Sequence, residues 1–273
     1  MRTQALATES EARSSGIAVD WPNGEHLGTW RVVAPLGRGG MAEVWHAVAA
    51  GGREAALKLP KPELRRHAGV NALIRREHDL LRSVASPHLV APYELIDCDG
   101  VAVLALEYLS QGDLVSMLGA PPRHWLPAFR TVLSALVALE RHGFAHGDVK
   151  ARNVLFAADG SARLADLALA RPLDAAAAAA TAAYGPPARS GARAHEADCF
   201  ALAALLFELL TAQLPYGPDG ASAGGAEPTP AALAEPEAAR LLAAATAALR
   251  AEGRGLGFSY FSDVIESVRF RHG

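Results

Sequence analysis

The chain of 273 residues has room for one large domain or two smaller lobes, and its 51% hydrophobic and 20% charged residues are typical of a folded protein. A formal net charge of −3 gives no reason to expect nucleic acid or an acidic lipid surface as a partner. Cys98 and Cys199 lie far apart without metal-ligand spacing, so we expect two free thiols in a reducing compartment. The most apolar run, Cys199 to Leu210, contains Glu208 and is shorter than the ~20 residues that span a bilayer. These features predict a cytoplasmic chain with a buried helix at this run and no membrane partner.

Residues 1–28 show no apolar periodicity and carry acidic residues, which predicts a flexible N-terminal arm rather than a signal peptide. From Thr29 the pattern becomes strand-like and includes one segment of helical period, Ala72–Val84. We expect a small sheet of about five strands with one helix. The predicted strands are Trp30–Val33, Ala42–Ala47, Glu54–Leu59, Tyr93–Ile96 and Val101–Tyr108.

After Gly112 the pattern is mostly helical. The predicted elements are a helix at Leu126–His142 that ends at Gly143, short strands at Val154–Phe156 and Arg163–Leu164, a loop at 217–232, and helices at about 235–251 and 259–268. The fold class is therefore α+β, with a β-rich N-terminal lobe at about 29–108, a hinge, an α-rich C-terminal lobe at about 112–268, and a tail at 269–273. A cleft between two lobes is a usual place for a ligand.

A glycine-rich segment, Leu36 to Val44, separates the first two of these strands. Gly37, Gly39 and Gly40 carry no Cβ, so their backbone N–H groups can approach a polyphosphate. The segment is neither a Walker A loop nor a Rossmann turn, because both of those enter a helix. Taken alone, it also fits an ordinary glycine hairpin.

The residues around this segment resemble the nucleotide loop of bacterial Ser/Thr protein kinases, which commonly reads Gly-x-Gly-Gly-Met-x-Glu-Val. The resemblance implies that Lys58 pairs with the α and β phosphates of ATP, and that Glu77, nineteen residues further on, holds this lysine in place. It also implies an adenine site, for which plain core packing is the alternative. Its apolar residues are Leu36, Val44, Ala56 and Leu155, and Glu107 and Leu109 offer hinge backbone groups.

The most specific stretch runs from Ala145 to Leu155 and contains His146-Gly147-Asp148. In the resembling family the matching aspartate, here Asp148, accepts the proton of the substrate hydroxyl, and Asn153 binds the second Mg²⁺. Asp166, thirteen residues beyond, fills the place of the aspartate that chelates the Mg²⁺ bridging the β and γ phosphates. Carboxylate and amide oxygens suit this hard cation.

Other residues resemble the Ser/Thr-specific subgroup of the family. Lys150 matches a lysine that neutralises the γ-phosphate, and Thr181 and Tyr184 match the segment that forms the substrate platform. The resemblance implies that Thr181 contacts Asp148 and Lys150. It also implies that Asp198, at the start of the buried helix, fixes the backbone of the catalytic loop.

The chain departs from the family in its activation segment. Gly147 replaces the arginine that normally binds a phosphorylated activation loop. Between Asp166 and Pro187 the only hydroxyl residues are Thr181 and Tyr184. We therefore expect activity that does not depend on phosphorylation of this loop.

Two further departures concern the backbone and the substrate platform. Ala168 replaces a flexible glycine and should restrict backbone flipping. Ala188 replaces a glutamate, which leaves Arg254 without its customary partner.

The predicted function is phosphoryl transfer from ATP, with Mg²⁺, to Ser/Thr hydroxyls of protein substrates. One alternative is a small-molecule phosphotransferase of the aminoglycoside or choline kinase type, which commonly reads His-Gly-Asp. The other is a pseudokinase scaffold. The chain ends at Gly273 without a membrane segment, so we expect its input through a soluble regulatory partner or the N-terminal arm.

Overall fold

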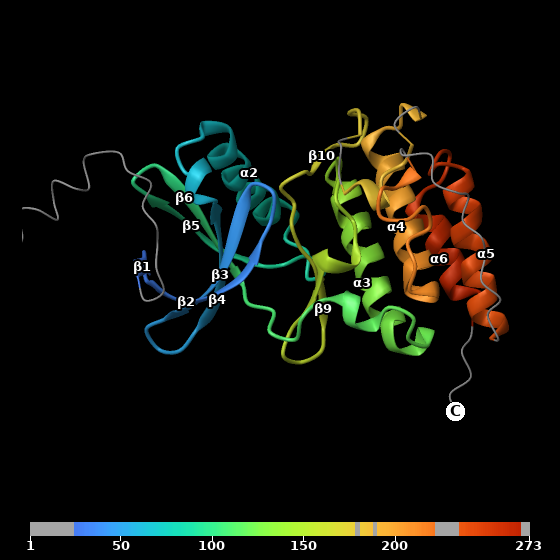
Figure 1. The fold of residues 1–273 in the computed structure, drawn as a ribbon, viewed down its shortest axis with the longest axis horizontal. Helices are drawn as coiled ribbons and strands as arrows, with labels where there is room; N and C mark the ends of the chain where they lie inside the picture. The colour runs from blue at the N-terminus through green and yellow to red at the C-terminus, as the bar shows by residue number, and fades with distance from the viewer. Residues whose placement is uncertain (1–24, 178–180, 188–189, 222–234, 269–273) are drawn as a thin grey trace, which may run out of the picture. The chain divides into compact units, whose positions relative to one another are not determined.

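The computed structural model describes residues 25–177, 181–187, 190–221 and 235–268 (Figure 1). The described residues form two compact units. One consists of the chain up to His78 together with Pro92–Tyr108, and the other of Asp79–Ala91 together with the chain from Leu109 onward. The first unit is built on a β-sheet and the second is mostly helical, which confirms the predicted α+β class.

A six-stranded antiparallel sheet forms the first unit, in the order β1-β2-β3-β4-β6-β5. Its strands are β1 His26–Leu27, β2 Trp30–Arg38, β3 Ala42–Ala49, β4 Glu54–Pro60, β5 Pro92–Cys98 and β6 Val101–Glu107. After β4 a short 3-10 helix, η1 (Pro62–Leu64), leads into helix α2 (Ala68–Val84). Five of the strands were predicted.

The sixth strand, β1, corrects the predicted end of the N-terminal arm. His26–Leu27 pairs with the start of β2, and the N–H of Val32 donates to the carbonyl of Glu25 at 2.8 Å. Leu27 is buried beside Trp30. A two-residue strand is too short to show a period of two, so its sequence carries no signal. The rest of the predicted arm, residues 1–24, and the tail, residues 269–273, lie outside the described residues.

The strand register separates the two faces of the sheet. On one face the core contains Ala47, Leu57 and Ala105, packed with Leu27 and Trp30. Successive side chains of a strand point to opposite faces. The neighbouring positions of the same strands therefore share the other face, and these are Val44, Ala56, Lys58 and Leu106, which the register pairs across β3, β4 and β6.

Helix α2 begins four residues before the predicted start, and its end belongs to the second unit. Its first turn is capped by His67, whose Nδ1 accepts from the N–H of Val70 at 3.3 Å. Histidine is not among the usual N-cap residues, which explains the missed start. Residues 79–91 were assigned to the N-terminal lobe, but backbone bonds tie them to the second unit. Val90 donates to Leu164, and Leu164 donates to His88, at 3.0 and 2.9 Å.

The helices of the second unit lie side by side (Figure 1). They are α3 Pro122–Arg141, α4 Ala194–Thr211, α5 Pro236–Arg250 and α6 Phe258–Glu266. Most residues of α4 are buried, which confirms the predicted buried helix. No helix among the described residues is long and apolar enough to cross a bilayer. Both cysteines are free thiols, as predicted.

Helix α3 begins at Pro122 rather than at Leu126. Proline suits the first helical position because its missing N–H would have no partner there. Pro127 lies further inside the helix and removes one backbone hydrogen bond near its start. The two prolines therefore hide the first turns of the helix from a sequence-based prediction.

Short elements place the loops of the second unit. These are strands β7 Phe144–Ala145, β8 Val154–Phe156, β9 Ala162–Leu164 and β10 Arg171–Pro172, and the 3-10 helices η2 Leu114–Met117, η3 Ala151–Asn153 and η4 Ala182–Tyr184. Strand β7 pairs with β10, and β8 pairs with β9. Of the predicted loop at 217–232, only residues 217–221 are described.

Candidate active site

The glycine-rich segment forms the connection between β2 and β3. Strand β2 continues through Gly37, which pairs with Val44, and the N–H of Gly39 donates to the carbonyl of Ala42 at 2.8 Å. A Cβ added at Gly37 or Gly40 would meet no atom within 4 Å, and neither glycine has a positive φ. The turn itself therefore does not require glycine here. The missing side chains leave open space beside the backbone, which suits the close approach of a ligand.

Lys58 and Glu77 form a buried ion pair within the first unit. The Lys58 Nζ donates to the Glu77 Oε2 at 2.6 Å, and the two side chains are 9% and 0% exposed. Strand β4 supplies the lysine and helix α2 the glutamate. The structure thus brings these two predicted residues together. A buried charge needs such a partner, because an unpaired ammonium in a dry environment is costly.

The predicted adenine residues are divided between the two units. Val44 and Ala56 share the sheet face of Lys58, and Leu36 is 45% exposed beside the glycine turn. Glu107 ends β6, within the same unit. By contrast, Leu109 and Leu155 belong to the second unit, where Leu109 is buried and Leu155 lies in β8.

In the second unit, three side chains donate to the carboxylate of Asp148. Lys150 Nζ lies 2.6 Å from Oδ2, Thr181 Oγ1 lies 2.8 Å from Oδ1, and Asn153 Nδ2 lies 3.1 Å from Oδ2. The Lys150 Nζ also donates to the hydroxyl oxygen of Thr181 at 2.9 Å. The predicted contacts of Thr181 with Asp148 and Lys150 are confirmed. The arrangement holds an ionised carboxylate beside a cation and a hydroxyl group.

Buried His146 links the catalytic loop to the segment that carries Asp166. Its Nδ1 accepts from the N–H of Asp148 at 3.1 Å, and its Nε2 donates to the carbonyl of Ala165 at 3.1 Å. A neutral imidazole has one donor and one acceptor, which matches both bonds. Burial lowers the pKa of His146, against the opposing charges of Asp166 and Asp148. The sequence analysis gave this histidine no role, although it lies within the quoted motif.

Asn153 and Asp166, the predicted metal ligands, are each fixed by local backbone geometry. Asn153 Nδ2 also donates to the carbonyl of Asp148 at 2.7 Å, which turns its amide oxygen away from that carbonyl. The carbonyl of Asn153 accepts from the N–H of Ala165 at 2.8 Å. Asp166 has a φ of +71°, an uncommon conformation outside glycine that often marks functional sites. No group of three or more His, Cys, Asp or Glu suited to a metal occurs among the described residues.

Asp198, at the start of α4, fixes the backbone of the catalytic loop. Its carboxylate accepts from the N–H of His146 at 2.6 Å and from the N–H of Gly147 at 2.9 Å. Burial raises the pKa of Asp198 to about 7, and these two hydrogen bonds act in the opposite direction. The structural role predicted for Asp198 is confirmed.

Gly147 occupies a position that a side chain cannot enter without movement of the backbone. Its φ is +84°, and an added Cβ would lie 2.6 Å from the carbonyl oxygen of Leu169. Glycine here therefore permits the close approach of the catalytic loop and the activation segment.

Backbone bonds hold the described part of the activation segment on two sides. Strand β10 pairs with β7, and Leu173 donates to the carbonyl of Gly143 at 3.2 Å. On the other side, His195 donates to Leu173 and Ala194 to Ala175, at 3.2 and 2.8 Å. Every one of these bonds is made by main-chain atoms.

Arg171 adds side-chain bonds to this segment. Its Nε donates to the carbonyl of Leu169 at 3.3 Å, and its Nη1 donates to the carbonyl of Ala176 at 3.1 Å. The sequence analysis missed this arginine, because bonds to backbone carbonyls leave no signature in residue types.

The substrate-platform segment is anchored by Tyr184, whose hydroxyl donates to Glu208 of α4. Burial, followed by this bond, raises the pKa of Tyr184. Arg254 donates to the carbonyl of Ser190 and lies 3.6 Å from Glu252. It thus has partners even though a glutamate is missing from position 188. Ala188 itself lies outside the described residues.

Comparison with known proteins agrees with this geometry. Residues 30–228 match the protein kinase domain. The chain therefore belongs to the protein kinase domain family.

Several relatives are serine/threonine kinases by name. The chain is 34% identical to CBL-interacting protein kinase 4 of Oryza sativa subsp. japonica over 208 residues, which make up 70% of this chain and 46% of that protein. It is 30% identical to serine/threonine-protein kinase PknD of Mycobacterium tuberculosis over 209 residues, 72% of this chain and 32% of PknD. It is 31% identical to PknE of Mycobacterium bovis over 217 residues, 74% of this chain and 38% of PknE. The chain thus spans less than half the length of each of these relatives.

Proposed function

We propose that the chain transfers the γ-phosphate of ATP to Ser/Thr hydroxyls of protein substrates. The observation that carries this proposal is the carboxylate of Asp148, which is held by Lys150 and by Thr181. A carboxylate within reach of a hydroxyl group is positioned as a proton acceptor. In this chain Thr181 marks where a hydroxyl group meets Asp148, and a substrate serine or threonine offers the same group.

Asp148 accepts the proton of the attacking hydroxyl group, whose oxygen forms the new bond to phosphorus while the bond to the β-phosphate oxygen breaks. Lys150 offers its ammonium charge to the transferred phosphoryl group, and its bond to Asp148 keeps that carboxylate ionised. Because the transition state is stabilised mainly by positioning and charge, a fixed Asp148 is worth more than a mobile one.

The nucleotide is assigned to residues of known placement in each unit. In the first unit we assign Lys58 to the α and β phosphates, Glu77 to the orientation of Lys58, and Gly37, Gly39 and Gly40 to backbone contacts with the phosphates. The open space beside Gly37 and Gly40 supports this assignment. The proposed adenine contacts are Leu36, Val44, Ala56, Glu107, Leu109 and Leu155.

Asn153 and Asp166 are assigned to Mg²⁺, which when bound neutralises charge on the β and γ phosphates. Both residues supply oxygen atoms, which this cation prefers, and phosphates and water complete its shell. The bond from Asn153 Nδ2 to the Asp148 carbonyl leaves the amide oxygen as the group that meets the cation.

We further propose that this activity does not require a phosphorylated activation segment. Backbone bonds to Gly143, Ala194 and His195 and the bonds of Arg171 hold the described part of the segment. Gly147 offers no guanidinium to a phosphate, and its close contact with Leu169 supplies a different connection.

Radiolabelled ATP tests the proposal directly. Wild type should label a basic protein and a serine-containing peptide, but neither a tyrosine-only peptide nor an aminoglycoside or choline. Asp148→Ala should abolish the labelling while binding of nucleotide persists. Transfer to the small molecules alone would assign the chain to the small-molecule phosphotransferases. No transfer by wild type, with nucleotide bound, would assign it to the scaffolds.

A further inference from the structure

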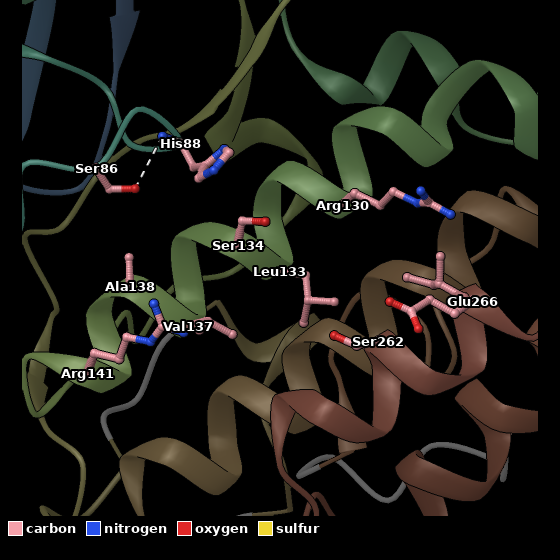
Figure 2. Close-up of a pocket in the computed structure, with 11 residues that line it drawn as sticks. Ser86, His88, Arg130, Leu133, Ser134, Val137, Ala138, Arg141, Ser262 and Glu266 are labelled. Carbon is pink, nitrogen blue, oxygen red and sulfur yellow. Dashed lines mark hydrogen bonds between the residues drawn. The ribbon is translucent and has the colours of Figure 1, made fainter.

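A groove of about 510 Å³ runs along one face of helix α3, within the second unit (Figure 2). Its floor residues recur at the spacing of a single helical face, so they form one stripe about 16 Å long. These residues are Arg130, Leu133, Ser134, Val137, Ala138 and Arg141. Ser86 and His88 line one side of the groove, and Ser262, Ile265 and Glu266 of α6 line the other.

The groove is apolar in the middle and basic at its ends. Leu133 and Val137 lie between Arg130 at one end and Arg141 at the other (Figure 2). Ile265 adds apolar surface from α6. An apolar stripe along a helix is normally covered by another element, because such faces pack against one another.

The two arginines are available to a ligand. Both are exposed, and neither guanidinium makes a hydrogen bond or an ion pair with any residue that the structure describes. Glu266 is the acidic residue among those lining the groove. Two arginines against one glutamate make this surface locally positive in a chain whose net charge is −3.

We propose that this groove docks an amphipathic helix of a partner protein, with apolar residues in its middle and a carboxylate near each end. A helix laid along α3 would bring carboxylates about eleven residues apart to Arg130 and Arg141, since both helices rise about 1.5 Å per residue. Arginine pairs with carboxylates through two parallel bonds, which adds direction to the charge attraction. The proposal concerns binding, and it stands independently of the proposed phosphotransfer.

A displayed library of 16-residue peptides, selected against the full chain and counter-selected against Arg130→Ala/Arg141→Ala, tests the proposal. The enriched peptides should carry Asp or Glu about eleven positions apart, with Leu, Ile, Val or Phe between them at helical spacing. A labelled enriched peptide, followed by fluorescence anisotropy, should bind the double variant at least tenfold more weakly than wild type. Raising the salt concentration should weaken binding to wild type more than binding to the double variant.

Two variants separate the groove from general effects. Arg123→Ala removes an exposed arginine of the same helix that does not line the groove, and it should leave the affinity within twofold. Ser134→Trp fills the middle of the groove without changing charge and should weaken binding at least tenfold. Circular dichroism of each variant should match that of wild type.

Enriched peptides without acidic ends, or equal affinity for wild type and the double arginine variant, would overturn the proposal. A concentration-dependent dimer that the arginine changes abolish would assign the groove to a second copy instead. A tenfold gain in peptide affinity on deletion of residues 1–24 would assign it to the chain's own N-terminal segment. Either result would equally contradict a partner helix as the occupant.

Discussion

Two parts of the molecule carry the proposed catalytic residues, and they are held in different ways. In the β-rich unit the glycine turn borders open space, and a buried ion pair positions Lys58. In the helical unit Asp148 accepts from three side chains, and Asp198 and His146 bind the backbone around it. The nucleotide residues can thus adjust to their ligand, whereas the proton acceptor is fixed by many contacts of the chain itself.

The largest expected effect comes from the catalytic loop. Asp148→Asn keeps the shape of the side chain but removes the proton acceptor, so kcat should fall by about 10³. Nucleotide affinity should stay within threefold, because the assigned nucleotide contacts of the first unit are unchanged. Steady-state kinetics and calorimetric titration with ATP measure the two quantities. A parallel loss of nucleotide affinity would contradict the proposed separation of roles.

The ion pair of the first unit gives the next largest effect. Glu77→Gln leaves the Lys58 ammonium buried without its carboxylate, which should lower the free energy of unfolding by about 3 kcal/mol. Lys58→Met/Glu77→Leu replaces both charges with apolar groups and should restore most of that stability but no activity. Urea unfolding with a phosphotransfer assay separates the two outcomes. A loss below ~0.5 kcal/mol for Glu77→Gln would show that the pair contributes like an exposed one.

The Gly147 contact with Leu169 predicts a smaller effect. Gly147→Ala adds a Cβ in a left-handed conformation and forces it against a backbone oxygen, so we expect a loss of about 2 kcal/mol. Gly160→Ala is the matched control, since its φ of +80° is similar and its added Cβ would meet no atom within 4 Å. The control should cost about 1 kcal/mol, the conformational part alone. Equal losses for the two variants would remove the close contact from the explanation.

The smallest effect is expected at Arg171. Arg171→Ala removes two bonds to activation-segment carbonyls and should lower kcat three- to tenfold with unchanged nucleotide affinity. Arg171→Lys should recover part of the rate, because an ammonium can still reach one carbonyl. A purely structural role would change the free energy of unfolding and leave kcat of the folded enzyme unaffected.

The sequence predicted the parts of the site that depend on local spacing. Asp148, Lys150 and Asn153 lie within six residues, so their mutual contacts follow from a short motif. The bonds between Asp198 and the loop backbone span about fifty residues, and only resemblance to a known family could foresee them.

Other features had no sequence signal that could reveal them. Strand β1 is too short for a period, the prolines of α3 conceal its start, and Arg171 binds backbone atoms. The groove on α3 combines residues from three segments, and only the fold shows that they line one surface.

The central claim is that the catalytic loop and the activation segment are organised by the chain's own contacts. Phosphotransfer by the full chain, measured before and after complete treatment with a protein phosphatase, tests it most directly, with mass spectrometry to verify that no phosphate remains. The account predicts rates that agree within twofold. A dephosphorylated protein that is inert, and that regains activity when Thr181 or Tyr184 is phosphorylated, would contradict it.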